Sequence, residues 1–139
     1  MPERIRNRGG FTLIELLIVL VIIGLLAGLV APRVFKGEKK GRMTAAKAQI
    51  QLLEQGLDQF RLDVGRYPSS SEGLAALQTS PGAEGWDGPY LKKGVPVDPW
   101  NHPYVYVSPG NHGDFDLYSY GADGAEGGEG ENKDITNWE

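Results

Sequence analysis

A carboxylate interrupts the longest apolar run of the chain. The run extends from Phe11 to Ala31, and its only strongly polar members are Thr12 and Glu15. In lipid, an ionised carboxylate is costly unless it is paired, and such groups mark functional positions by default. We therefore predict a functional role for Glu15.

Acidic residues also gather at the other end of the chain. From residue 114 to residue 139 there are eight acids and a single base, Lys133. The acids are Asp114, Asp116, Asp123, Glu126, Glu129, Glu131, Asp134 and Glu139. The glycines from Gly121 to Gly130 make this stretch a flexible loop rich in oxygen ligands, which calcium prefers, although its aspartate spacing is not that of an EF-hand. Composition leaves two interpretations open, a calcium-binding loop and a solvated acidic tail.

The sequence gives little support to a zinc site, a catalytic serine, a phosphate-binding loop or nucleic-acid binding. His102 and His112 are the only histidines and there is no cysteine, so the sequence offers no zinc-site spacing. The serines at 69–71 lie in a turn, where capping explains them better than nucleophilic catalysis does. The glycines from Gly124 to Gly130 lack the lysine of a phosphate-binding loop. The net charge of −4 argues against a general nucleic-acid binder. We predict that the protein is not an enzyme.

The apolar run predicts a membrane-spanning helix, because its length corresponds to roughly 30 Å. Arg4, Arg6 and Arg8 precede it, which places the N-terminus in the cytoplasm and everything after Ala31 across the membrane. A cleaved secretory signal would have a shorter apolar region, of about 7 to 15 residues. An ordinary signal anchor would fit the length and the charge but leaves Glu15 unexplained.

The membrane helix contains residues that weaken helices, namely Gly24, Gly28 and Pro32. Pro32 cannot donate a hydrogen bond to the carbonyl of Gly28. Neighbouring helices can compensate for such residues in a membrane. Any local unwinding is expected between Gly24 and Pro32.

A basic segment follows, at residues 33–42. Its bases are Arg33, Lys36, Lys39, Lys40 and Arg42, against the single acid Glu38. Three interpretations stay open: contact with lipid head groups, contact with acidic neighbours, and a solvated helix face.

Six apolar residues then recur at alternating spacings of four and three, which is typical of one helix face. They are Ala46, Ile50, Leu53, Leu57, Phe60 and Val64. We expect a globular domain to cover this face, rather than a coiled-coil partner, because the stripe hardly reaches three heptads. Gly65 and Pro68 should end the helix near Val64.

Shorter elements complete the predicted fold. Ser69 and Glu72 form a possible capping box that would open a short helix through Gln78. Residues 98–103 indicate a turn, and residues 104–107 and 115–120 indicate strands joined through residues 109–111. The predicted class is α+β, with a long N-terminal helix packed on a small antiparallel sheet.

A motif at the start of the apolar run resembles the class III signal of type IV pilin-like precursors. It is RGGFTLIEL, from Arg8 to Leu16. The resemblance implies that prepilin peptidase cleaves between Gly10 and Phe11 and methylates the new amine on Phe11. It also implies that Glu15 is needed for assembly and lies near the amine of an adjacent subunit. Residues 1–10 would be the leader, residues 11–32 the membrane and polymerisation helix, and residues 33–139 the periplasmic domain.

Further short sequence motifs resemble those of the major pseudopilins of type II secretion systems. With them, the resemblance covers nearly the whole chain. They are Gly65-Arg66-Tyr67-Pro68, Glu72-Gly73-Leu74, Asp98-Pro99-Trp100, Pro103-Tyr104, Asp116-Leu117 and Asp134-Ile135-Thr136-Asn137-Trp138. One departure is Asn101-His102, where the family usually has glycine and then asparagine. The resemblance implies a pilin-like fold and a homopolymer, the periplasmic pseudopilus. Its implied partners are minor pseudopilins, the inner-membrane assembly platform and prepilin peptidase.

The resemblance also favours calcium for the acidic loop, at about residues 120–138. The implied ligands are the carboxylates of Asp123 and Asp134 and the backbone carbonyls of Tyr120 and Ala125. This chain has a longer insert rich in glycine and glutamate, so the remaining ligand is either Glu131 or Asn132.

Two alternative functions stay open at this point. A type IV pilin would share the whole N-terminal argument, but such pilins usually close a C-terminal loop with two cysteines, and this chain has none. A membrane-anchored calcium-binding domain that never polymerises would keep its N-terminus uncleaved and behave as a monomer in detergent.

Overall fold

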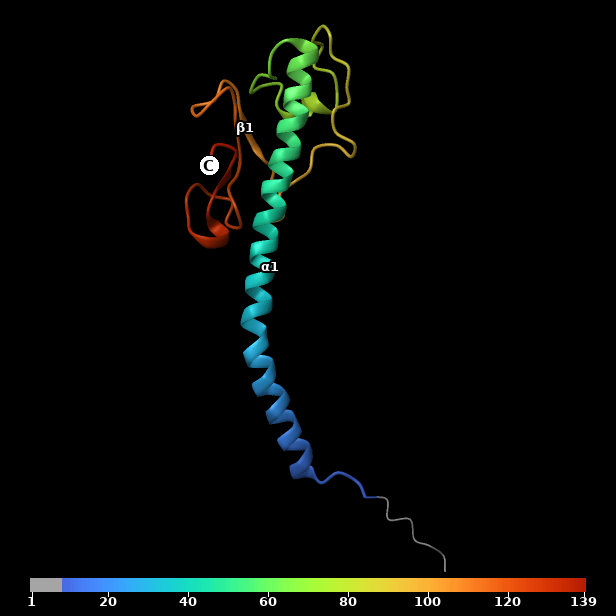
Figure 1. Cartoon of the computed structure of the whole chain (residues 1–139), viewed down its shortest axis with the longest axis vertical. Helices are drawn as coiled ribbons and strands as arrows, with labels where there is room; N and C mark the ends of the chain where they lie inside the picture. Colours follow the sequence, from blue (N-terminus) through green and yellow to red (C-terminus); the bar gives the residue numbers. More distant parts are fainter. Residues whose placement is uncertain (1–8) are drawn as a thin grey trace, which may run out of the picture. The chain divides into compact units, whose positions relative to one another are not determined.

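One long helix, α1, extends from Leu13 to Val64 (Figure 1). The computed structural model describes residues 9–139, apart from the side chains of residues 32, 34 and 35. These residues belong to two compact units, one ending at Glu38 and one comprising Lys39–Glu139. The helix ends at Val64, as predicted, because Gly65 follows with a φ of 91°, which favours glycine and closes the helix.

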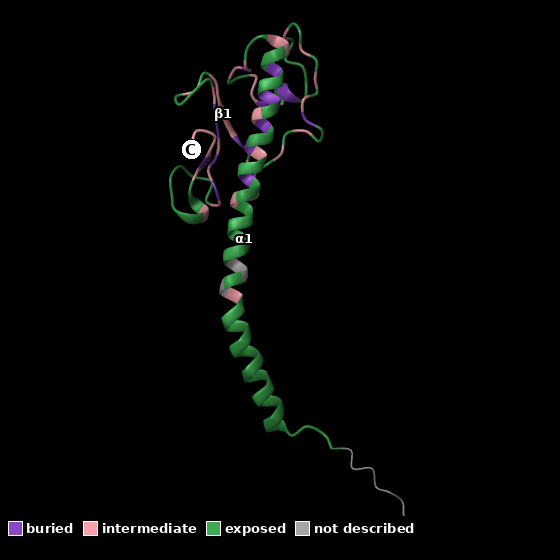
Figure 2. Cartoon of the chain, in the orientation of Figure 1, coloured by how far each residue is buried: buried purple, intermediate pink, exposed green. Residues whose placement is uncertain are grey.

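The N-terminal part of α1 carries large apolar side chains. They are exposed, and Figure 2 shows this part of the helix mainly in green. By length and composition it is able to cross a membrane, which agrees with the predicted membrane helix. The backbone is α-helical through Gly24, Gly28 and residue 32. The expected unwinding of this segment concerns the assembled polymer and stays a prediction.

The predicted apolar stripe forms the core of the second unit. Its first five members are buried, and the sixth, Val64, packs against the core from a half-buried position. Leu77, Leu117 and Ile135 come from later segments and are buried against the same face. Full burial of a leucine or isoleucine contributes about 1.5–3 kcal/mol. The stem helix is therefore the scaffold on which the rest of the domain folds.

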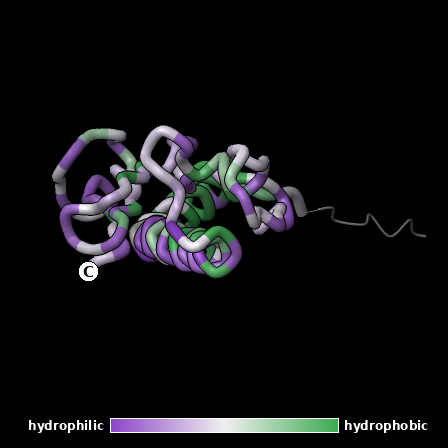
Figure 3. The backbone as a smooth tube through the Cα atoms, turned by 90° about the horizontal axis from the view of Figure 1, so that it is seen from above, coloured by the Kyte–Doolittle hydropathy of each residue, from purple (hydrophilic) through white to green (hydrophobic). Residues whose placement is uncertain are grey.

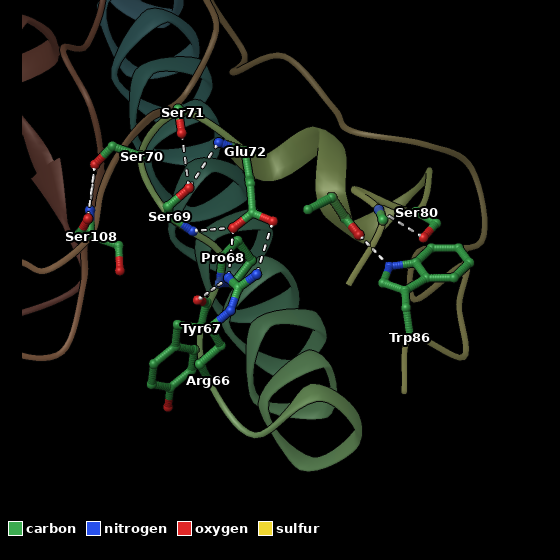
Figure 4. A network of polar contacts seen from close by, with 12 residues as sticks. Arg66, Tyr67, Pro68, Ser69, Ser70, Ser71, Glu72, Ser80, Trp86 and Ser108 are labelled. Carbon is green, nitrogen blue, oxygen red and sulfur yellow. Dashed lines mark hydrogen bonds and ion pairs between the residues drawn. The ribbon is translucent and has the colours of Figure 1, made fainter. Parts of the chain in front are cut away.

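Ser69 and Glu72 form the predicted capping box (Figure 4). The backbone N–H of Glu72 donates to Ser69 Oγ at 3.2 Å, and the backbone N–H of Ser69 donates to Glu72 Oε1 at 2.9 Å. The expected helix does not start there, however. Gly73 has a φ of 64° and separates the capped turn from a 3₁₀-helix, η1 (Leu74–Leu77), so the predicted helix is corrected to a turn followed by η1.

Glu72 also pairs with Arg66, whose two terminal nitrogens lie 2.6 Å and 3.1 Å from the two carboxylate oxygens. The hydrogen bonds from Arg66, followed by those from Ser69, lower the pKa of Glu72 from 4.5 to about 2. Folding therefore favours the ionised form of the Glu72 carboxylate. The stability that it contributes is therefore complete above pH 4.5 and is lost as the pH falls toward 2.

Replacing Glu72 by glutamine should lower the free energy of unfolding by about 1 kcal/mol at neutral pH, because one cap and one ion pair are weakened. Urea unfolding of both proteins across the pH range measures this. The difference should shrink between pH 4.5 and pH 2. The control is Glu84→Gln, at an exposed carboxylate, which should change little. A difference that stays constant down to pH 2 would contradict the role of the ionised carboxylate.

The sheet has three strands in the order β1-β2-β3, all antiparallel. Strands β1 (Val105–Val107) and β2 (Asp116–Ser119) confirm the two predicted strands, with slightly shorter bounds. Strand β3 (Ile135–Thr136) is too short to show an alternating pattern in the sequence and was not predicted. Asn137 continues its pairing with side chain and backbone, because both its Oδ1 and its N–H bond to the backbone of Leu117. The α+β class is confirmed.

The predicted turn before β1 is built around the buried carboxylate of Asp98. Its Oδ1 accepts hydrogen bonds from the backbone N–H groups of Trp100 and His102, at 3.0 Å and 2.8 Å. Asn101 has a φ of 70°, which asparagine tolerates better than most residues do. The same conformation suits glycine, the residue that the resemblance leads us to expect at this position.

Candidate functional site

The first candidate site is the N-terminal segment around Glu15. Thr12 caps α1, because its Oγ1 accepts the backbone N–H of Glu15 at 3.2 Å and its carbonyl accepts that of Leu16 at 3.2 Å. The cap places Glu15 in the first turn of the helix. Phe11 is 88% exposed immediately before the cap. A carboxylate and an aromatic residue thus lie together at the exposed start of an apolar helix.

The glycines of this segment are not required by the fold of the chain itself. A Cβ atom built on Gly10 would meet nothing within 4 Å, and the same holds for Gly24 and Gly28. A requirement for glycine at position 10 would therefore come from another molecule that handles the chain. Residues 1–8, which include Arg4, Arg6 and Arg8 of the predicted leader, lie outside the described residues.

The second candidate site is the acidic loop that follows β2, drawn mainly in purple and white near the C-terminus in Figure 3. The backbone N–H of Ala122 donates to the carbonyl of Glu131 at 2.8 Å and closes the loop. A short 3₁₀-helix, η2 (Gly130–Asn132), forms its far side. Gly121 is required here, because a Cβ atom would lie 2.6 Å from the carbonyl oxygen of Glu131.

The structure places the predicted calcium ligands on this closed loop with unequal surroundings. Asp123 Oδ1 accepts the backbone N–H of Ala125, and Asp134 Oδ2 accepts that of Gly127, both at 3.2 Å. Asp134 Oδ1 and Glu131 Oε1 are buried, and neither has a hydrogen-bond partner among the described residues. Glu131 Oε1 lies 3.8 Å from Arg42 Nη1 on α1.

The buried Oδ1 of Asp134 fits a hard cation, because buried polar atoms normally have partners, whereas Glu131 Oε1 already lies beside the guanidinium of Arg42. Within residues 9–139, no three side chains of Asp, Glu, His or Cys converge as a ready-made metal cluster. Backbone carbonyls, such as those of Tyr120 and Ala125, would have to complete the shell. A bound calcium ion would supply the positive charge that draws the carboxylates of Asp123 and Asp134 together.

Sequence reasoning missed a cavity beside this loop. Its volume is about 220 Å³, and Glu126 lines it together with Asp134 and Tyr118. A hydrogen bond with Tyr120, together with burial and the charge of Glu126, raises the pKa of Tyr118 to about 12. No sequence signal distinguished Glu126 from the other acids, because only the folded loop brings it and Asp134 to the same cavity.

A histidine and a tryptophan fasten the C-terminus next to the same cavity. His112 Nδ1 lies 2.9 Å from Asp116 Oδ2, and its ring stacks on Trp138 with a centroid distance of 3.9 Å. Burial acts to raise the pKa of Asp116, but hydrogen bonds from His112 and the backbone of Asn111 outweigh it and hold that pKa below 3.8. His112 thus has a structural partner in the fold.

Two family models match this chain, one over the N-terminal segment that holds the first site and one over the remainder that holds the second. The model described as a prokaryotic N-terminal methylation motif matches residues 5–31. The model of type II secretion system protein G matches residues 33–138. The chain belongs to the type II secretion system protein G family.

The sequences of relatives align with this major pseudopilin over nearly their full length. The type II secretion system core protein G of Pseudomonas aeruginosa is 48% identical, over 96% of this chain and 97% of its own. That of Vibrio cholerae is 41% identical, over 98% of this chain and 95% of its own. The crystal structure of the major pseudopilin from enterohaemorrhagic Escherichia coli is 33% identical, with a TM-score of 0.63 over 73% of this chain and 90% of that one.

Membership in this family settles the broad function. The pseudopilin is a structural component of a multi-protein secretion machine, and its family is not one of enzymes. The apolar helix and the methylation motif fit a membrane-anchored protein. The resemblance inferred from the sequence is confirmed, and the type IV pilin alternative gives way to the pseudopilin.

Proposed function

We propose that this pseudopilin polymerises through its N-terminal helix into the periplasmic pseudopilus of a type II secretion system. Prepilin peptidase first cleaves between Gly10 and Phe11 and methylates the new amine. The observation that carries the proposal is the exposed apolar helix, which begins at Leu13 and keeps a carboxylate at Glu15. Cleavage before this helix leaves it in the mature protein, so a hydrophobic stem reaches the polymer intact.

Cleavage creates the partner that Glu15 needs. It converts the neutral amide between Gly10 and Phe11 into a charged amine. An opposite charge within about 4 to 6 Å stabilises an ionised carboxylate, whereas isolation in lipid favours the neutral form. The methylated amine of Phe11 in one subunit would meet Glu15 in the next. Each added subunit thereby relieves an unpaired group in the membrane.

Calcium binding by the loop at residues 120–138 belongs to the same proposal. Its support is the buried Oδ1 of Asp134, which has no hydrogen bond within the described chain. Asp123 would contribute a further carboxylate, and the carbonyls of Tyr120 and Ala125 would complete the set. Since the domain has no cysteine, calcium would take the place of a disulfide in holding the loop.

The proposed location follows from the polarity of the chain. The leader stays in the cytoplasm, one helix spans the inner membrane, and the domain from residue 33 onward is periplasmic. Minor pseudopilins and the inner-membrane assembly platform are the proposed partners in filament growth. The apolar helix supports this arrangement, because it is the segment of the described chain that is long and apolar enough to span a bilayer.

An intact mass of the protein from its host tests the processing step. We expect loss of residues 1–10 and the addition of one methyl group. Gly10→Val should block cleavage, because the peptidase would have to accommodate a branched side chain. Gly113→Val is the matched control, since Gly113 is also an open position, and it should be processed normally.

Two outcomes would contradict this proposal. Mature-sized protein from Gly10→Val would show that cleavage does not depend on this glycine. A wild-type protein that keeps residues 1–10 and is monomeric in detergent would favour the membrane-anchored domain that does not polymerise.

A further inference from the structure

The basic segment, residues 33–42, lies between the apolar run and the domain core on α1. It carries five bases and one acid. Arg33, Lys36, Lys39 and Lys40 are all exposed. The buried core begins only at Ala46. These four exposed side chains precede the core in the sequence and are not part of it, so we look for their role in a partner outside the chain.

We propose that the basic segment binds the head groups of anionic phospholipids at the periplasmic surface of the membrane. The proposal rests on the membrane anchoring stated under the proposed function. Lys40 is nine residues beyond Ala31, which is about 14 Å along a helix and at most about 32 Å in a fully extended chain. Chain connectivity alone thus keeps the segment close to the bilayer surface whenever the apolar run is inserted.

Lipid is favoured over the acids of a second copy, because chain connectivity holds the segment at the bilayer surface in every inserted subunit, whether or not a second copy is bound. Five of the eight acids at residues 114–139 also have contacts within their own chain. These are Asp114 with Arg61, Asp116 with His112, Asp123 with the N–H of Ala125, Glu131 with Arg42, and Asp134 with the N–H of Gly127.

The location of these bases also indicates a specific use. Lysine and arginine near membrane helices are normally in excess on the cytoplasmic side. Here the flank on the translocated side has five bases, against three, Arg4, Arg6 and Arg8, in the leader. Bases in this position do not assist the proposed orientation. An attraction to anionic head groups, worth up to about fivefold in affinity per lysine or arginine, is a reason to have them there.

The test uses the full chain reconstituted in phosphatidylcholine vesicles that contain a minor fraction of phosphatidylglycerol. Spin-labelled forms of the two lipids report which head group is enriched next to the protein. We expect a preference of at least about threefold for phosphatidylglycerol, falling as salt rises. Lys39→Gln/Lys40→Gln should reduce that preference at least about threefold.

The matched control is Lys92→Gln/Lys93→Gln, which removes the same charge from another exposed lysine pair. It should keep the preference of the wild type. Equal preferences in all three proteins would overturn the inference. So would self-association in pure phosphatidylcholine that disappears in Lys39→Gln/Lys40→Gln, since it would make a second copy the partner. Failure of the wild type to float with vesicles of either composition would instead overturn the proposed membrane anchoring.

Discussion

Glu15→Ala should leave the pseudopilin cleaved and inserted in the membrane but abolish filament growth. The carboxylate is exposed in the first turn of α1, outside the unit that carries the buried core. Its removal should therefore spare folding. Docking of a new subunit would lose the pairing between this carboxylate and the amine of Phe11, which is the interaction that processing creates.

Two further variants separate charge from shape. Glu15→Gln keeps the size and the hydrogen-bonding groups but has no charge, and it should fail as Glu15→Ala does. Glu38→Ala removes a carboxylate from the same helix beyond the apolar run, and it should assemble normally. The measurements are the sheared filament fraction, the membrane fraction and the mass of the processed protein. Normal filament yield from Glu15→Ala would refute the docking role, and normal yield from Glu15→Gln would refute the role of charge.

Chelation of calcium should lower the melting temperature of the purified full chain by about 5 to 10 °C. Extracellular modules bind calcium at roughly 10⁻⁴ to 10⁻³ M. A tenfold excess over such a dissociation constant stabilises a domain by about 1.4 kcal/mol, which corresponds to a shift of this size. The affected region should be the loop between Tyr120 and Trp138, with faster hydrogen exchange after chelation.

Variants of the loop test the ligand assignment. Asp123→Ala and Asp134→Ala should each melt at the temperature of the chelated wild type and respond little to added calcium. Glu129→Ala removes an exposed carboxylate from the same loop and should keep the response of the wild type. Identical melting of the wild type with calcium and with excess chelator would refute the calcium site and leave the membership in the pseudopilin family intact.

The sequence by itself determined the stem helix and its two environments. Apart from Thr12 and Glu15, the run at residues 11–31 is apolar on every side of a helix, so its composition assigns it to apolar surroundings such as a membrane. The stripe from Ala46 to Val64 follows the helical period, and period depends only on local geometry. The motif around Gly10 is likewise contiguous. For these reasons α1, its end at Val64 and the resemblance to the family could be predicted before the fold was known.

Local patterns also located β1 and β2, since aromatic residues alternate with valine at residues 104–107 and recur at residues 115–120 between clear turn signals. They misjudged the segment after the capping box. Ser69 and Glu72 have the right spacing for a helix start, but the left-handed conformation of Gly73 ends the turn first. That conformation is imposed by where the chain must go next, which spacing does not encode.

Only the tertiary structure decided what the acidic loop offers. By composition, the eight acids at residues 114–139 are equivalent, but folding gives them different surroundings. Closure of the loop on Glu131 leaves one oxygen of Asp134 buried without a hydrogen bond, while His112 takes Asp116 and Arg42 approaches Glu131. The short strand β3 likewise exists only because β2 provides its hydrogen bonds. Such differences arise from contacts between residues far apart in the chain, so only folding can assign a separate environment to each carboxylate.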